Sequence, residues 1–227
     1  NHILVRHEQA AGFLAQGMAR TTGLPAGCIA TSGPGAMNLL TAIADARSDS
    51  IPLVAITGQV NTSLIGTDAF QEADTFGLSF PITKHSILVK SAKDLLTAIP
   101  QAFAIASSGR CGPVLVDVPR DVQLEKITFE SWPECGIKDN HSARFRTVGE
   151  NFAKAIDESA TMLLNSKNPV IFAGGGCNSP LASKGIKELQ EIFSLLAISP
   201  ILNIPTILSF SITGILLIWF SCITLLT

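Results

Sequence analysis

Charged side chains are scarce in this chain. Only 15% of its 227 residues are Asp, Glu, Lys or Arg, against roughly 25% in an average soluble domain. The formal net charge is -2, so there is no basic surplus of the kind that binds nucleic acid or an anionic membrane. We therefore expect one large or two modest globular domains and no nucleic-acid partner.

Cysteine and histidine are few and scattered. The five cysteines have no C-x-x-C spacing, and the four histidines do not cluster with them. This pattern argues against a zinc site or a disulfide framework. An odd number of cysteines suits a reducing compartment, so we expect a cytoplasmic protein whose thiols are buried apolar groups.

The features of a secretory leader are absent from the first residues, which lack a charged n-region and an apolar h-region. We expect the chain to begin inside a domain. Ionisable side chains stop at Glu191, and Thr206 to Thr227 is mostly apolar. This run has the length of a membrane helix but lacks flanking basic residues.

We interpret residues 194–227 as a hydrophobic tail, and two origins stay open for it. One is a shift of the reading frame, and the other is a genuine hydrophobic segment. In either case we expect the tail to be poorly placed or helical, because nothing in its pattern matches the domain that precedes it.

What the chain does contain is a regular alternation of short apolar strands and amphipathic helices. Pro100 inside the last helix predicts a kink or two joined helices. The alternation predicts an α/β fold, a parallel sheet with helices on both faces, in residues 1–128. The expected strands are 28–31, 52–57, 82–89 and 113–118, and the expected helices are 6–22, 36–47 and 92–108.

A change in composition separates this first domain from a second one. Residues 129–147 are polar and contain Pro133 and Gly136, so we interpret them as a linker. Residues 148–193 then begin a second α/β domain. Its expected elements are a helix at 152–164, a strand at 169–173, a Gly-rich turn at 174–176 and a helix at 181–193.

Several motifs stand at strand-to-helix junctions. Ser32-Gly-Pro-Gly35 and Gly174-Gly-Gly176 each follow a strand, and such turns let a cofactor approach the backbone. Taken alone they are weak evidence, because many such turns look alike. Glu8 begins a helix, where the helix dipole favours an acid, and Asp68-Ala-Phe-Gln-Glu72 taken alone predicts a solvated turn.

Taken in order, however, six segments resemble one family. Their order and spacing are similar to those of the large subunit of acetolactate (acetohydroxyacid) synthase, over residues 5 to about 178. The segments are Arg6-His-Glu-Gln9, Ala30-Thr-Ser-Gly-Pro-Gly35, Asp49 to Val60, Ile65-Gly-Thr-Asp-Ala-Phe-Gln-Glu72, Ile82-Thr-Lys-His85 and Gly109 to Gln123.

The resemblance implies a pyrimidine-binding domain of a thiamine-diphosphate enzyme at 1–128, lacking its first strands, and the start of an FAD-binding-type domain at 148–193. Glu8 matches the glutamate that hydrogen-bonds the aminopyrimidine ring and promotes proton transfer within the cofactor. By the same resemblance, Ser50 and Gln71 are cofactor neighbours, Phe70 and Lys84 line the substrate channel, and Arg110, Gly174, Gly175 and Gly176 contact FAD.

The parent enzyme would condense two 2-oxo acids, pyruvate with pyruvate or 2-oxobutyrate, with loss of CO2 in branched-chain amino acid synthesis. Its cofactors would be thiamine diphosphate, FAD and Mg2+, with the Mg2+ ligands outside this chain. Its partners would be a second large subunit and a small regulatory subunit.

We expect this chain alone to be inactive. Two alternatives are kept. One is another thiamine-diphosphate carboligase or decarboxylase, which the run from Ile65 to Glu72 disfavours. The other is a non-catalytic remnant with a membrane tail.

Overall fold

The structure, a computed structural model, describes residues 2–133, 152–167, 169–177, 180–193, 196–198 and 216–220. The chain divides into two units, Asn1–Thr147 and Val148–Thr227. Most of the expected linker and most of the apolar tail lie outside the described residues.

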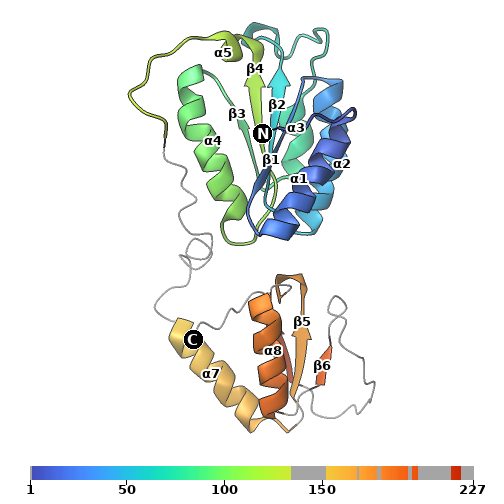
Figure 1. Ribbon diagram of the computed structural model, residues 1–227, viewed down its shortest axis with the longest axis vertical. Helices are drawn as coiled ribbons and strands as arrows, with labels where there is room; N and C mark the ends of the chain where they lie inside the picture. Colours follow the sequence, from blue (N-terminus) through green and yellow to red (C-terminus); the bar gives the residue numbers. More distant parts are fainter. Residues whose placement is uncertain are drawn as a thin grey trace. The chain divides into compact units, whose positions relative to one another are not determined.

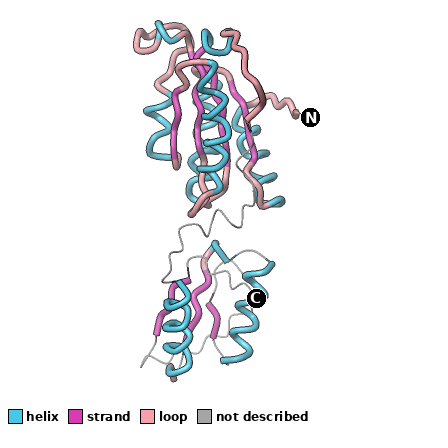
Figure 2. The backbone as a smooth tube through the Cα atoms, turned by 90° about the vertical axis from the view of Figure 1, so that its left-hand side faces the viewer, coloured by secondary structure: helices cyan, strands magenta, loops and turns pink. Residues whose placement is uncertain are grey.

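The first unit is built on a four-stranded parallel sheet in the order β1-β2-β4-β3 (Figures 1 and 2). Helices flank this sheet, so the predicted α/β class is confirmed. The strands are β1 (Ala26–Ala30), β2 (Leu53–Gln59), β3 (His85–Leu88) and β4 (Val114–Pro119). The helices are α1 (Glu8–Thr22), α2 (Pro34–Ser48), α3 (Thr75–Ser79), α4 (Ala92–Ser107) and α5 (Arg120–Leu124), with short 3-10 turns η1 (Thr62–Leu64) and η2 (Phe80–Ile82).

Side chains of the central strands alternate between two buried layers. The register pairs Val54 with Val114 and Ala55 with Leu115, and all four are fully buried. Ala55 and Leu115 belong to a cluster with α1 and α2, whereas Val54 and Val114 belong to one with α4. Burial on both faces explains why these strands are continuous apolar runs rather than alternating ones.

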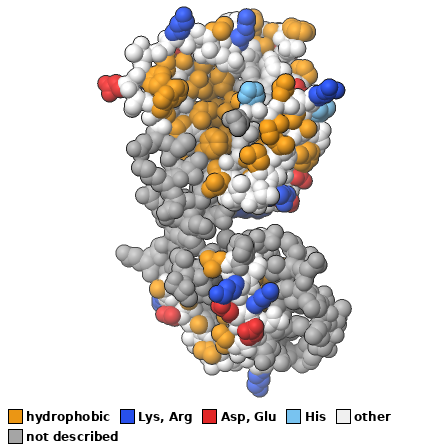
Figure 3. Space-filling model, viewed as in Figure 1, with side chains coloured by type: hydrophobic (Ala, Val, Ile, Leu, Met, Phe, Trp, Pro, Cys, Tyr) orange, Lys and Arg blue, Asp and Glu red, His pale blue; other side chains and the backbone are white. Residues whose placement is uncertain are grey.

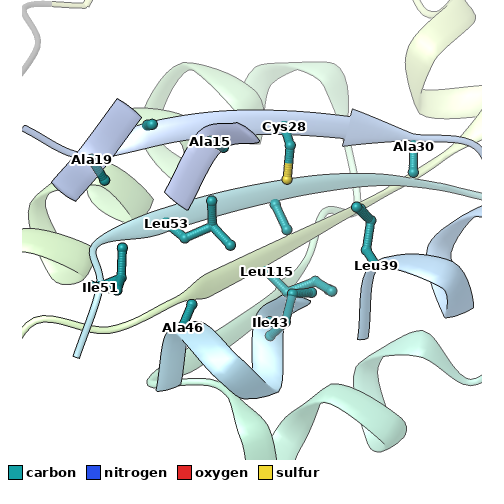
Figure 4. Packing of buried hydrophobic residues seen from close by; sticks show 12 residues of the cluster. Ala15, Ala19, Cys28, Ala30, Leu39, Ile43, Ala46, Ile51, Leu53 and Leu115 are labelled. Atoms are coloured by element: carbon teal, nitrogen blue, oxygen red, sulfur yellow. The ribbon is translucent and has the colours of Figure 1, made fainter. Parts of the chain in front are cut away.

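Small residues bring α1 close to its neighbours. Figure 4 shows Ala15 and Ala19 of α1 over the sheet, with Leu39, Ile43 and Ala46 of α2 in the same cluster. The helix begins after His7, whose Nδ1 accepts a hydrogen bond from the Gln9 amide at 3.1 Å. It ends at Gly23 with φ 71°, a left-handed conformation that glycine adopts without strain.

Two local expectations need correction. Residues 92–107 form one helix that contains Pro100, so the alternative of two joined helices was wrong. The third strand starts at His85 rather than residue 82, because Ile82 belongs to η2. The Thr83 hydroxyl donates to the Ser79 carbonyl at 2.8 Å, which keeps this segment in a turn.

One edge of the sheet is incompletely covered. β1 pairs only with β2 among the described strands, and Ile29 is 73% exposed on the face opposite Cys28 and Ala30. Figure 3 shows apolar side chains gathered on the visible face of this unit, in the region that Figure 1 fills with α4 and β1. A parallel strand is normally buried on both faces, whereas β1 is buried on only one of its two faces.

The second unit has a three-stranded parallel sheet in the order β6-β5-β7. Ala173, Cys177 and Ile186 form its described core. The elements are α7 (Phe152–Asn165), β5 (Pro169–Ala173), the 3-10 turn η3 (Gly175–Cys177), α8 (Pro180–Phe193), β6 (Leu196–Ile198) and β7 (Leu216–Phe220).

β7 lies inside the apolar run that we expected to be poorly placed or helical. It is instead a strand, paired with β5 from Pro169↔Leu216 to Ala173↔Phe220, so the helical expectation was wrong there. Among the described residues, no helix combines the length and apolarity needed to cross a membrane.

Two glycines of α1 give a matched test of the α1–α2 contact. A Cβ at Gly12 would lie 2.5 Å from the Ala42 Cβ, whereas a Cβ at Gly17 would meet nothing within 4 Å. We expect Gly12→Ala to destabilise the first unit by about 1–3 kcal/mol through overpacking. Gly17→Ala should stabilise it by about 0.5–1 kcal/mol, because alanine favours the helix. Denaturant unfolding of both variants measures the difference, and equal effects would contradict the contact.

Candidate functional site

The candidate site lies at the edge of the first sheet where the strands end. The turn after β1 and the loop after β2 meet there, and the first residue of α1 joins them through its contacts with α2. In open α/β sheets, ligands bind outside the carboxyl ends of the strands. This is therefore the edge at which the fold itself predicts a binding site.

Glu8 reaches this edge from the start of α1. Its Oε2 accepts a hydrogen bond from Asn38 Nδ2 at 3.0 Å, which links α1 to α2. That bond is the main cause that lowers the pKa of Glu8, so the side chain is a carboxylate at neutral pH. A carboxylate offers about four acceptor positions, and Asn38 uses one of them.

Two glycines make room at the same place. A Cβ at Gly35 would lie 3.3 Å from Glu8 Oε1 and 2.6 Å from Thr31 Cγ2. A Cβ at Gly33 would lie 2.6 Å from the Gln71 carbonyl oxygen. Glycine at both positions therefore lets the Glu8 carboxylate and the Gln71 backbone approach the turn between β1 and α2.

The loop after β2 carries Phe70 and Gln71. Gln71 has φ 60°, a left-handed conformation that side chains disfavour, and it lies against Gly33. Phe70 is 89% exposed, so no contact within the first unit buries its ring. An exposed phenyl ring on the residue before Gln71 is suited to contact a flat, partly polar ligand.

A buried carboxylate lies beneath this loop. Asp117 near the end of β4 is 1% exposed and accepts hydrogen bonds from Thr57 Oγ1 at 2.8 Å and Gln59 Nε2 at 3.1 Å. Gln59 Nε2 also donates to the Ala73 carbonyl at 2.8 Å, which ties the loop to the sheet. Burial raises the pKa of Asp117 to about 6, although the bonds from Thr57 and Gln59 act in the opposite direction.

The opposite edge of the sheet holds the other predicted residues of this unit. Ser50, Lys84 and Arg110 all precede strands, so they lie at the amino ends of β2, β3 and β4. Parallel strands rise about 3.3 Å per residue, which separates the two edges by roughly 20 Å along β2. The structure therefore does not bring these three residues together with Glu8.

Two contacts define this second group. Arg110 Nε donates to Ser50 Oγ at 2.8 Å. Lys84 Nζ donates to the carbonyls of Ile105 and Ser108 and to Ser108 Oγ, at the end of α4. Partial burial lowers the pKa of Lys84. Its hydrogen bonds nevertheless place the ammonium group at the carboxyl end of a helix, where a cation is favoured.

The Gly-rich turn belongs to the second unit. Gly174 follows β5, and its carbonyl accepts a hydrogen bond from the Cys177 amide at 2.9 Å, at the start of η3. A Cβ at Gly174 would meet nothing within 4 Å, so this backbone is open to a ligand. Within the described ranges there is no cluster of three or more His, Cys, Asp or Glu side chains suited to a metal ion.

Comparison with known proteins finds, along most of the chain, relatives in the same family that the sequence motifs resemble. Residues 1–78 match the family described as "Thiamine pyrophosphate enzyme, N-terminal TPP binding domain". The acetolactate synthase isozyme 1 large subunit of Escherichia coli (strain K12) is 52% identical over 192 residues, which are 84% of this chain and 33% of that protein. Over the matched residues, this chain is homologous to the large subunits of acetolactate synthases.

Further acetolactate synthases match with similar coverage. The acetolactate synthase of Mycobacterium bovis is 49% identical over 195 residues, or 84% of this chain and 30% of that protein. The acetolactate synthase large subunit of Corynebacterium glutamicum is 43% identical over 205 residues, which are 90% of this chain and 32% of that protein. The chain thus spans about a third of the length of these curated relatives.

The family motifs led to Glu8 but not to the residues that hold the site together. Asn38 was missed, although it lies four residues after Pro34 and so shares a face of α2 with the motif. Asp117 was read only as part of the apolar strand motif. Its hydrogen-bond partners Thr57 and Gln59 are two residues apart in β2 and therefore lie on one face of the sheet. Two polar residues at that spacing in a buried strand were the available signal for a buried polar partner on the neighbouring strand.

Asp117 should make the first unit less stable as pH rises from about 4 to about 6. The unfolded chain ionises near the ordinary value of 3.8, whereas the folded chain keeps the proton to about 6. Rising pH therefore favours the unfolded state, by up to about 3 kcal/mol at ~1.36 kcal/mol per pKa unit. The difference in unfolding free energy between wild type and Asp117→Asn should change across this window. A difference that is constant from about pH 4 to pH 7 would contradict the assignment.

Lys84 allows a test of the contact at the end of α4. Lys84→Met removes the donor from two carbonyls and a hydroxyl, and we expect a loss of about 1–3 kcal/mol in unfolding free energy. Lys93→Met, at an exposed position in the first turn of the same helix, should change it by less than about 0.5 kcal/mol. Similar small effects for both variants would show that the Lys84 contacts contribute little.

Proposed function

We propose that this chain provides the pyrimidine-binding part of an acetolactate synthase, a transferase that joins two 2-oxo acids with loss of CO2. The observation that carries the proposal is the Glu8 carboxylate, held by Asn38 at the carboxyl-terminal edge of the sheet. It lies within the residues that match the thiamine pyrophosphate domain. The substrates would be pyruvate with pyruvate or 2-oxobutyrate, in the pathway to isoleucine and valine.

The residues at this edge fit an aminopyrimidine ring. Gly33 and Gly35 bring no side chain to the turn, and the Glu8 carboxylate retains acceptor positions beyond the one used by Asn38. Thiamine diphosphate supplies, when bound, the electron sink that decarboxylation of a 2-oxo acid needs. Glu8 would accept a hydrogen bond from the ring nitrogen and exchange a proton with it, while Asn38 keeps the carboxylate in place.

The neighbouring loop would complete this pocket. The Gln71 backbone lies against Gly33, and its side-chain amide can form a hydrogen bond with a polar group of the cofactor or substrate. Phe70 offers an exposed ring for the wall of the substrate channel. Both would act by positioning and by excluding water, because neither side chain gains or loses a proton near neutral pH.

For FAD, the family resemblance implies contacts in each of the two units. The open Gly174–Gly176 turn suits a cofactor phosphate, because small residues after a strand expose backbone amides. Arg110, fixed by Ser50, offers a cation at the amino-terminal edge of the first sheet. By the family resemblance we also propose Lys84 as a residue of the substrate channel; it precedes β3 and so lies at the same edge of the sheet as Arg110.

The full enzyme would need more than this chain. Mg2+ would be bound by residues outside it, and the relatives are named as large subunits, so we propose a second large subunit and a smaller regulatory subunit as partners. We expect the 227-residue chain alone to form no acetolactate from pyruvate with thiamine diphosphate, Mg2+ and FAD supplied. Measurable product would refute this.

A graft tests the role of Glu8. The matched residues of this chain replace their counterparts in the isozyme 1 large subunit of Escherichia coli, and acetolactate formation is measured. Glu8→Gln should leave folding intact and lower turnover roughly 10²–10⁴-fold, the usual contribution of general acid-base catalysis. Glu130→Gln, at an exposed position, is the control and should have no effect. Near-normal turnover in the Glu8 variant would reject the assigned role.

A further inference from the structure

Glu72 follows Gln71, and its carboxylate turns back onto the backbone of its own loop. Its oxygens accept hydrogen bonds from the amides of Gly66, Thr67 and Ala69, the last two at 3.1 Å. Backbone amides that converge in this way form an anion-binding nest. Here the nest is filled by a carboxylate of the same chain, and the bond from Gly66 is the main cause that lowers the pKa of Glu72.

The loop that carries these amides has an unfavourable backbone conformation. Gly66 has φ 84°, but Asp68 and Gln71 also have positive φ, at 56° and 60°. Residues with a Cβ avoid this region, and they remain in it only where surrounding contacts impose it. The loop therefore requires contacts that hold it in shape.

The structure provides such contacts on both sides of Phe70. On one side, the Gln71 backbone lies against Gly33, and the Ala73 carbonyl accepts a bond from Gln59 at 2.8 Å. On the other side, the Glu72 carboxylate binds the stretch from Gly66 to Ala69. Because the Phe70 ring is 89% exposed, its direction depends on the loop backbone rather than on packing.

We propose that Glu72 is a positioning residue of the candidate site. Its carboxylate fixes residues 66–69, and thereby holds the left-handed turn that presents Phe70 and Gln71 beside Gly33. This inference rests on the proposed function, because it concerns two residues assigned there to the substrate channel and the cofactor. It adds a residue that touches neither ligand but sets the geometry of those that do.

The chemistry of the nest explains why a carboxylate is needed. The groups that bind the Glu72 carboxylate are backbone N–H donors, those of Gly66, Thr67 and Ala69 together with Asp68, so the side chain must present acceptors alone. Glutamine would replace one acceptor oxygen with an NH2 group that is itself a donor. Aspartate would keep the charge but shorten the side chain by one methylene, so it should retain some of the hydrogen bonds to the loop amides.

Hydrogen exchange in the 227-residue chain tests the proposal directly. In Glu72→Gln, the amides of Gly66, Thr67 and Ala69 should exchange at least about tenfold faster, the factor expected from loss of one typical hydrogen bond. Amides of β2 and β4 should keep their protection. Glu72→Asp should fall between wild type and the glutamine variant, and it gives the same readout if Glu72→Gln does not fold.

Asp68→Asn is the matched control. It removes a carboxylate from the same loop but leaves Glu72 in place, and asparagine tolerates the left-handed conformation. Its exchange at residues 66–69 should equal that of wild type. Unchanged exchange in Glu72→Gln would overturn the proposal. Faster exchange throughout β2 and β4 would also overturn it, since Glu72 would then support the whole unit rather than the loop.

The graft separates this inference from the proposed function. If Glu8→Gln lowers turnover but Glu72→Gln changes neither kcat nor KM, the positioning role of Glu72 is rejected and the function stands. If Glu8→Gln has no effect while exchange at residues 66–69 still rises in Glu72→Gln, the proposed function fails and the role of Glu72 in the loop stands.

Discussion

Burial of β2 and β4 on both faces is the constraint on which the rest of the first unit depends. Their paired residues, Val54 with Val114 and Ala55 with Leu115, point in turn to opposite layers. Because each layer needs a cover, α1 and α2 must lie on one face and α4 on the other. Because the strands are parallel, segments that follow a strand reach one edge of the sheet, and segments that precede a strand reach the other.

This constraint makes part of the site predictable from the sequence. Gln71 follows β2, whereas Ser50 and Arg110 precede β2 and β4, so chain order alone places them at opposite edges. Strands β1, β2 and β4 were read closely because Gly or Pro stands beside each apolar run. The start of β3 was misplaced because Pro81 belongs to η2 and does not mark the beginning of the strand. The pairing of Glu8 with Asn38 could not be read in this way, since it depends on how closely α1 packs on α2 at Gly12.

Where periodicity carried no information, the prediction failed. The apolar run that contains Leu216–Phe220 has no alternation of polar residues, so its pattern cannot distinguish a buried strand from a helix. The structure pairs it with β5, a long-range contact that no local signal encodes. The left-handed conformation of Gln71 was missed for a similar reason, because it is imposed by Gly33 and by the bonds of Glu72.

Three carboxylates at or below the site edge are held by uncharged donors. Glu8 accepts from Asn38, Glu72 from backbone amides, and Asp117 from Thr57 and Gln59. No ion pair between described residues includes any of the three. A nearby Lys or Arg would favour the ionised form strongly and oppose proton uptake. A neutral amide fixes the position of Glu8 at a smaller cost to its basicity, and the proton exchange that we propose for Glu8 would require both properties in one side chain.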